Sequence, residues 1–207
     1  MASHIYECIE KIGQSIIDNR DFLTELDREI GDADHGINMA RGFCEVLAQL
    51  PADNEDIGAA LKKTGMVLLS KVGGASGPLY GTACLEAAKV CAGRTALTAE
   101  DGKTVFAAVI AGIQKRGKAV RGEKTMLDAI IPASEAYAAA VDAGAPLDAC
   151  LDAMCEAAKE GAEYTASIRA TKGRASYLGD RSIGHKDPGA ASSLLAMEAI
   201  RSYVKGA

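Results

Sequence analysis

Apolar residues recur at steps of three and four along most of this 207-residue chain, the spacing of one face of an α-helix. Alanine, which has the best helix propensity, is the most frequent residue, and no segment alternates apolar and polar residues as a strand would. We therefore predict an all-α fold, an antiparallel bundle or barrel of eight helices. The predicted helices cover residues 5–19, 37–50, 57–72, 78–93, 98–117, 126–143, 147–168 and 188–205.

Length and charge narrow the class of protein. At about 150 residues per domain, the chain is expected to form one domain over residues 1–207. Its formal net charge is −5 and it has no basic run, so nucleic-acid binding is not expected. The sequence has no leader pattern, no apolar run long enough to span a membrane, and six cysteines without a C-x-x-C pair. We expect a protein of the reducing cytoplasm that does not bind a membrane.

Local signals mark some of the helix ends. Thr98 and Asp101 form the pattern of a capping box at a helix start. Pro78 suits the first turn of a helix, where its missing N–H costs nothing, and Pro132 is expected to bend the helix that contains it. Asp187 precedes Pro188 and suits the N-cap of the last helix.

The segment 19–36 is polar and is predicted to be a loop with three aspartates, Asp27, Asp32 and Asp34. Residues two apart do not share a helical face, so the last two carboxylates converge only on a non-helical backbone, which the neighbouring glycines permit. A carboxylate cluster favours Mg²⁺, Mn²⁺ or Ca²⁺, and the spacing excludes an EF-hand. A solvated acidic turn is the alternative, and His35 is not favoured as a metal ligand.

Two further glycine-marked loops complement the acidic one. The residues 73–77 lead into a helix, whose first N–H groups suit an anion, although the pattern is not a P-loop and a tight connection is the alternative. The residues 172–187 concentrate cationic side chains in an acidic protein, and Arg174 or Arg181 could hold a phosphate, unless this is only a solvated loop. Together the three loops supply what a magnesium nucleotide needs.

Four motifs give the sequence a recognisable likeness. The segments LTELDREIGDADHGINMARGF, GGASGPLYGT, RGKA with EKTMLDA, and KGRASYLGDRSIGHKDPGA resemble the nucleotide-binding subunits of bacterial, phosphotransferase-system-dependent dihydroxyacetone kinases. The likeness spans nearly the whole chain, with the motifs in the same order. It implies an antiparallel eight-helix barrel with the nucleotide site in loops at one end.

The resemblance also implies a set of site residues. The family's metal ligands, which hold two Mg²⁺ ions, match Asp27, Asp32 and Asp34, and these three act in catalysis with Arg174 by offsetting charge on the transferring phosphoryl group. The implied ADP or ATP contacts are His35, Gly36, Ile37, Asn38, Ala75, Ser76, Gly117, Met126, Arg174, Asp187, Pro188 and Gly189.

The activity implied by the resemblance is phosphoryl transfer to dihydroxyacetone. In the phosphotransferase-dependent members, bound ADP is a fixed cofactor, rephosphorylated by a phosphohistidine subunit of the DhaM type and discharged onto dihydroxyacetone in a subunit of the DhaK type. ATP-dependent relatives fuse this domain to the substrate domain, which the 207 residues lack, so we expect a separate subunit. The alternatives are a subunit of an ATP-dependent kinase for another small ketose, and a regulatory module whose nucleotide state controls a transcription regulator. Relatives also suggest a lipid inside the barrel, although apolar inward faces are more often plain core.

Overall fold

The computed structural model describes residues 4–206, and in this range all regular structure is helical. The all-α prediction is confirmed. The predicted count of eight was wrong, because the described residues form nine α-helices and two 3₁₀ segments. These are α1 (His4–Asp18), α2 (Arg20–Ile30), α3 (His35–Gln49), α4 (Ile57–Lys71), α5 (Ser76–Val90), α6 (Ala99–Gly117), α7 (Leu127–Asp142), α8 (Leu147–Tyr164), η1 (Thr165–Ser167), η2 (Arg174–Ser182) and α9 (Pro188–Gly206).

The additional helix, α2, lies in segment 19–36, which was predicted to be a loop. Its buried face consists of Leu23, Thr24, Asp27 and Ile30, at helical spacing. Two of these four inward residues are polar, so a search for apolar repeats does not find the helix. Helix α8 also ends earlier than predicted, at Tyr164, and continues as the 3₁₀ segment η1.

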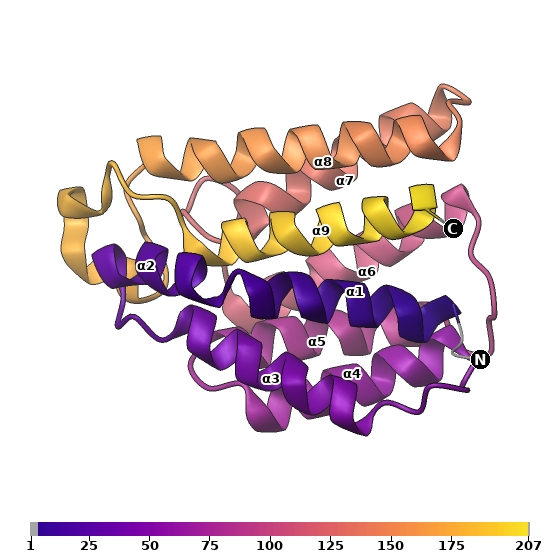
Figure 1. Cartoon of the computed structure of the whole chain (residues 1–207). Coiled ribbons are helices and arrows are strands. Elements are labelled where there is room, and N and C mark those ends of the chain that lie inside the picture. Colours follow the sequence, from indigo (N-terminus) through magenta and orange to yellow (C-terminus); the bar gives the residue numbers. More distant parts are fainter. Residues whose placement is uncertain (1–3, 207) are drawn as a thin grey trace.

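The helices run back and forth, and helices α3, α5, α7 and α9 all begin at the same end of the molecule (Figure 1). From α3 onward each helix packs on the next, while α1 packs on both α3 and α9. The two larger apolar cores that result are centred on α6, α7 and α8 and on α1, α3 and α4. The connections at the end where α3, α5, α7 and α9 begin are thereby brought together.

The local helix-end predictions agree with the structure. Thr98 Oγ1 accepts a hydrogen bond from the Asp101 N–H at 3.2 Å, and the Asp101 carboxylate accepts one from the Thr98 N–H at 2.9 Å. Pro78 lies in the first turn of α5. Pro132 lies inside α7, and the bend expected there stays a prediction. These signals act through neighbouring residues, which is why the sequence reveals them.

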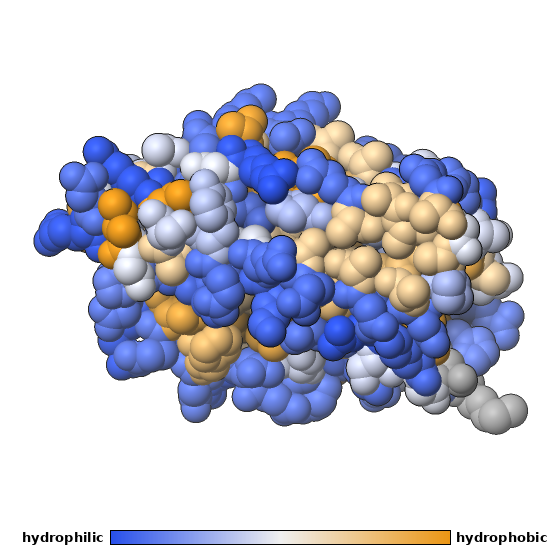
Figure 2. Space-filling model, turned by 90° about the horizontal axis from the view of Figure 1, so that it is seen from above, coloured by the Kyte–Doolittle hydropathy of each residue, from blue (hydrophilic) through white to orange (hydrophobic). Residues whose placement is uncertain are grey.

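The upper surface shows how polarity is distributed outside the cores. It is mostly hydrophilic, with a broad, weakly hydrophobic area toward the end remote from the starts of α3, α5, α7 and α9 (Figure 2). In the α7–α8 region Ala139, Ala143 and Ala149 are exposed, and scattered small apolar residues are normal on a protein surface. Across residues 4–206, no helix combines the length and apolar character that crossing a membrane requires.

Candidate functional site

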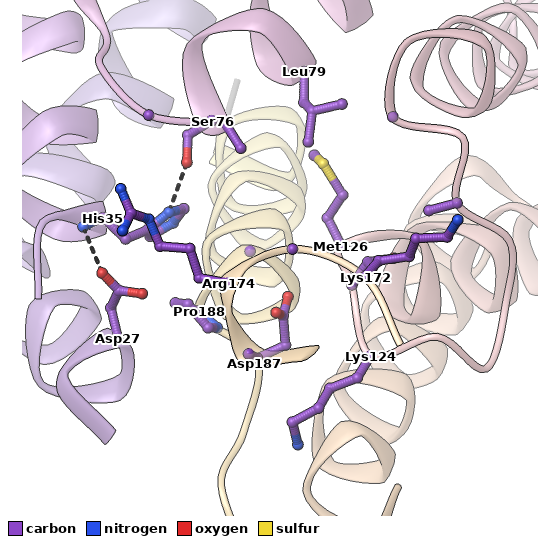
Figure 3. A pocket seen from close by; sticks show the side chains of 18 of the residues that line it. Asp27, His35, Ser76, Leu79, Lys124, Met126, Lys172, Arg174, Asp187 and Pro188 are labelled. Carbon is purple, nitrogen blue, oxygen red and sulfur yellow. Dashed lines mark hydrogen bonds between the residues drawn. The ribbon is translucent and has the colours of Figure 1, made fainter. Parts of the chain in front are cut away.

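A cavity of about 330 Å³ lies where α3, α5, α7 and α9 begin. Its wall includes His35, Ser76, Leu127 and Pro188, which are the first residues of α3, α5, α7 and α9. Figure 3 shows Asp27, His35 and Ser76 on one side of this cavity and Met126, Lys172 and Lys124 on the other. Helix N-termini carry partial positive charge and unpaired N–H groups, so four of them around one cavity favour an anionic ligand.

Three carboxylates form a cluster in the wall. Asp27 extends from α2, and Asp32 and Asp34 from the loop between α2 and α3, with one oxygen of each within 4.8 Å of the others. Ala33, between the loop aspartates, has φ of 59°, so the backbone there is non-helical, as predicted from their spacing. The burial differs along the cluster: Asp27 is buried, Asp34 is half-buried and Asp32 is exposed.

Asp27 organises the loop that carries the other two aspartates. Its Oδ2 accepts hydrogen bonds from the backbone N–H groups of Asp34 at 2.8 Å and His35 at 3.1 Å. These bonds satisfy N–H groups at the start of α3, which have no partner within the helix. Gly31 lies against the same carboxylate, and a Cβ there would overlap Asp27 Oδ1. The buried aspartate therefore holds the loop in place with one oxygen.

The donor set of this cluster fits a divalent cation. Burial raises the pKa of Asp34, a hydrogen bond from Asn38 lowers it, and the negative charges of Asp32 and Asp27 raise it further. A bound cation stabilises the ionised form of such a cluster, because it offsets the repulsion between the carboxylates. Carboxylate oxygens with room for water suit Mg²⁺ better than softer metals.

Gly36 explains how α2 and α3 approach each other beside the cluster. A Cβ on Gly36 would overlap the backbone carbonyl of Arg20 and the hydroxyl of Thr24, both on α2. Only glycine allows this approach without moving one helix. The glycine thus brings Asp27 on α2 within reach of the N-terminus of α3.

His35 is buried, with an exposed fraction of 6%. Its Nδ1 lies 2.8 Å from Ser76 Oγ and its Nε2 lies 2.9 Å from Ser192 Oγ. Burial lowers the pKa of His35 to about 4, although the charge of Asp27 opposes this shift, so the imidazole is neutral at physiological pH. Both ring nitrogens therefore have a hydroxyl partner, and the expectation that this histidine is not a metal ligand stays a prediction.

Cationic side chains reach the cavity from two other segments. Arg174, at the start of η2, places Nη2 2.8 Å from Asp32 Oδ2. Lys124 is 1% exposed, and its ammonium donates hydrogen bonds to the carbonyls of Thr165 and His185. Through these hydrogen bonds Lys124 connects the segment between α8 and α9 to the loop before α7.

Asp187 is the N-cap of α9, as predicted. Its Oδ2 accepts a hydrogen bond from the Ala190 N–H at 2.7 Å, and its own N–H donates to Thr165 Oγ1 at 2.9 Å. Burial raises the pKa of Asp187 to about 7, against the lowering effects of the Ala190 N–H and of Lys124. A carboxyl group that titrates near neutrality thus faces the cavity.

The opposite part of the cavity is apolar. Leu79, Ile113, Met126 and Leu127 line it, and the last three belong to the core between α6 and α8. In Figure 3 Leu79 and Met126 lie close together, away from Asp27. The cavity therefore combines an acidic metal-type corner, helix N-termini and an apolar slot, the parts that an anionic ligand with a flat ring requires.

The structure brings most of the predicted site residues into one wall. Gly36, Ile37 and Asn38 follow in the first turn of α3 and are not among the cavity-lining residues. Arg181 also does not line it. Those that do are Asp27, Asp32, Asp34, His35, Ala75, Ser76, Gly117, Met126, Arg174, Asp187, Pro188 and Gly189.

Sequence reasoning missed several lining residues. Arg116 precedes a predicted contact, and Lys124 and Thr125 lie in the EKTMLDA motif, so proximity to a motif was the available signal. The apolar residues gave no signal, because they repeat like core residues. The missed residues also include Ile30, Gly74, Pro78, Leu79, Tyr80, Ile113, Ala119, Leu127, Lys172, Gly173 and Ala175.

Known proteins resemble this chain over nearly its full length. It is 45% identical over 204 residues to the ADP-binding subunit DhaL of the PEP-dependent dihydroxyacetone kinase of Escherichia coli, covering 98% of this chain and 97% of that one. It is 43% identical to the ADP-binding subunit DhaL of the PTS-dependent dihydroxyacetone kinase of Lactococcus lactis, covering 96% and 95%.

The fold also matches a solved structure. A dihydroxyacetone kinase from C. freundii, crystallised with AMP-PNP and Mg²⁺, superposes with a TM-score of 0.72 at 25% identity, over 96% of this chain and 33% of that longer one. Residues 29–202 match the model of the DAK2 domain. This chain therefore belongs to the DAK2 domain family, in the group of DhaL-type ADP-binding subunits.

Proposed function

We propose that this chain is the ADP-binding subunit of a multi-subunit dihydroxyacetone kinase, formed as one DhaL-type domain that works in the cytoplasm. It holds ADP or ATP with two Mg²⁺ ions, and phosphoryl groups pass through this nucleotide to dihydroxyacetone. The observation that carries the proposal is the meeting of three carboxylates and four helix N-termini at one cavity. The near-full-length likeness to DhaL subunits supports the same function.

In this proposal different residues of the cavity bind different parts of the ligand. Asp27, Asp32 and Asp34 would hold the metal ions, which would neutralise phosphate charge when bound. Ser76 and the first N–H groups of α5 bind phosphate oxygens. Arg174 leaves Asp32 to offset charge on the transferring group.

The remaining residues hold the nucleoside. Leu79 and Met126 enclose the base in the apolar slot, and the backbone at Gly117 contacts its edge. Asp187 faces the same cavity with Pro188, where its carboxyl can accept hydrogen bonds from the ligand. All of this is positioning and charge neutralisation, the main components of catalysis in phosphoryl transfer.

Two partners complete the proposed reaction. A DhaK-type subunit orients dihydroxyacetone, and a DhaM-type phosphohistidine subunit recharges the nucleotide. No histidine of this chain carries phosphate in the scheme: His35 is buried with both ring nitrogens occupied. In this scheme the DhaK-type partner orients the ketone, and lost orientation costs roughly 7 to 11 kcal/mol of barrier.

Reconstitution tests this proposal. The chain alone with ATP and dihydroxyacetone should form almost no dihydroxyacetone phosphate, and adding DhaK- and DhaM-type subunits with phosphoenolpyruvate and the general phosphotransferase proteins should restore turnover. A control mixture without the chain should stay inactive. Labelled phosphate recovered covalently on His35 or His185 would contradict the nucleotide-carrier scheme.

The alternative, an ATP-dependent kinase for another small ketose, differs in how the nucleotide exchanges. Native mass spectrometry of the purified chain should find retained ADP with two Mg²⁺ ions under the main proposal. Rapid exchange of ATP by a chain purified empty would favour the alternative.

A further inference from the structure

A chain of buried polar groups runs through the interior and ends at the cavity wall. Tyr80 Oη lies 2.6 Å from Ser192 Oγ, and this hydroxyl lies 2.9 Å from His35 Nε2. On the other side of the ring, His35 Nδ1 lies 2.8 Å from Ser76 Oγ. Ser192 has no exposed surface, while Ser76 and Tyr80, at the two ends, line the cavity. The contacts join α5 to α9, α9 to α3, and α3 back to α5.

The hydrogen bonds that link Tyr80 to Ser76 can run in either of two donor directions, because a neutral imidazole has one donor and one acceptor nitrogen. In the first, Tyr80 donates to Ser192, Ser192 donates to Nε2, and Nδ1–H donates to Ser76 Oγ. The Ser76 hydroxyl proton is then available to the cavity. In the second, Ser76 donates to Nδ1, and only its lone pairs face the cavity.

The contacts at Tyr80, the end of this hydrogen-bond series opposite Ser76, favour the first direction. A phenol is a stronger donor than an aliphatic hydroxyl, and the contact of Tyr80 with Ser192 is the shortest that this phenol makes with a neighbouring hydroxyl. The Gly189 carbonyl receives the Ser193 hydroxyl at 2.8 Å and lies 3.1 Å from both the phenol and Ser192 Oγ. His35 Nε2, at 2.9 Å, is the nearer acceptor for the Ser192 hydroxyl.

The cavity end favours the same direction. Phosphate oxygens only accept hydrogen bonds, so a Ser76 hydroxyl that donates toward the cavity attracts them, whereas exposed lone pairs would repel them. Ser76 is also the first residue of α5, where backbone N–H groups face the same way.

We propose that His35 is a positioning residue in the Nδ1–H form, which transmits the donor direction set by Tyr80 to Ser76, so that the Ser76 hydroxyl donates to a nucleotide phosphate. The choice of phosphate as the recipient rests on the proposed function. Neither Tyr80 nor Ser192 needs to contact phosphate for this effect.

Nitrogen-15 NMR of the ligand-free protein tests the direction without nucleotide. His35 should show Nδ1 protonated and Nε2 unprotonated, and its signals can be assigned through His4→Gln and His185→Gln, which alter the other two histidines. In Tyr80→Phe, Ser192 can turn to the Gly189 carbonyl at 3.1 Å and accept from His35, so the proton should move to Nε2. A wild-type protein with Nε2 protonated would overturn the proposal.

Calorimetry with ADP and Mg²⁺ tests the consequence. Tyr80→Phe should weaken ADP binding about tenfold, the effect of one hydrogen bond to a charged group. Ser193→Ala is the matched control: it removes a neighbouring buried hydroxyl that contacts the same phenol and carbonyl but lies outside the chain of donors. It should leave both the His35 proton position and the affinity unchanged.

Two substitutions of His35 provide a rescue test. The amide in His35→Asn stands near the place of Nδ1 and can still donate to Ser76, whereas the amide in His35→Gln stands near the place of Nε2. His35→Asn should therefore bind ADP more tightly than His35→Gln. Equal affinities, or Tyr80→Phe binding like wild type, would overturn the inference, whereas a wild-type protein that binds no ADP would overturn the proposed function itself.

Discussion

Arg174 Nη2 lies 2.8 Å from Asp32 Oδ2, so the basic segment before α9 is paired with a carboxylate of the acidic loop. The two side chains are 67% and 34% exposed, and exposed pairs contribute little to stability. We expect Arg174→Ala to change the free energy of unfolding by less than about 1 kcal/mol.

Binding should respond differently to the same change. Arg174→Ala should weaken binding of ADP with Mg²⁺ about tenfold or more, and Arg174→Lys should bind with intermediate affinity, because lysine lacks the bidentate fork. Arg169→Ala is a matched control, since Arg169 pairs with Asp180 in the same region and does not line the cavity. Equal affinities of Arg174→Ala and Arg169→Ala would exclude a phosphate-binding role for Arg174.

Removing one charge from the carboxylate cluster should reduce nucleotide binding. Asp32→Asn or Asp34→Asn takes away an anionic ligand, so phosphate and the remaining carboxylates are less well neutralised. We expect at least about tenfold weaker ADP binding at fixed Mg²⁺ by calorimetry. Asp180→Asn serves as a control on an exposed residue. Unchanged binding in both cluster variants would remove the metal-site assignment.

The ligand should also stabilise the fold. ADP with Mg²⁺ binds only the native state, and a free concentration of 100 times Kd adds about 2.7 kcal/mol. For a chain of this size that corresponds to a rise in Tm of roughly 5 to 10 °C. A chelator should reverse the rise in a thermal melt of nucleotide-loaded protein, and identical melts with and without chelator would count against metal-dependent binding.

Asp187 should make stability depend on pH. Its pKa of about 7 in the folded protein lies above the unfolded value of about 3.9. The folded state therefore retains a proton that the unfolded chain releases, and this contribution to stability is lost as the pH rises from about 4 to 7.

The substitution Asp187→Asn removes that titration and keeps a residue suited to the N-cap. The free energy of unfolding of the variant minus that of wild type should increase with pH between 5 and 8, by on the order of 1 to 2 kcal/mol. Denaturant melts of ligand-free protein with chelator measure it. A difference that is constant over this range would mean that Asp187 is ionised throughout.

The contact of α2 with α3 predicts a strong effect at Gly36. Gly36→Ala forces its Cβ into the Arg20 carbonyl, so α2 must move, and we expect a loss of about 1 to 3 kcal/mol in stability together with weaker ADP binding. Gly13→Ala is the comparison, since its Cβ would meet only the side chains of Phe43 and Leu47 at 3.2 Å or more. If the two variants are equally stable, the packing argument fails.

The extent to which the sequence predicts this fold depends on where each helix faces. Helices with an apolar inward face, such as α1 and α6, are predictable because burial imposes the three- and four-residue spacing. Helix α2 was not, because Thr24 and Asp27 occupy its buried face. Because the site needs a buried carboxylate on α2, this helix lacks the apolar repeat by which helices are recognised in a sequence.

The residues of the site also fall into two groups, those that could be predicted from the sequence and those that could not. The carboxylates and Arg174 stand out from sequence because charge is costly to bury and concentrates where a ligand offsets it. The chain from Tyr80 through Ser192 to His35 could not be read from sequence, since its members lie up to 157 positions apart and meet only through the packing of α3, α5 and α9. Leu79 and Ile113 were hidden for the opposite reason, because they look like ordinary core.

The up-and-down course of the helices sets where other molecules can be attached. The described ends of the chain lie close together, with His4 Nδ1 3.0 Å from Tyr203 Oη. Both lie at the far end of the bundle from the cavity (Figure 1). An affinity tag or a tethered second domain at either terminus therefore leaves the cavity mouth accessible, and its linker must extend along the whole length of the helices before its cargo can reach a bound ligand.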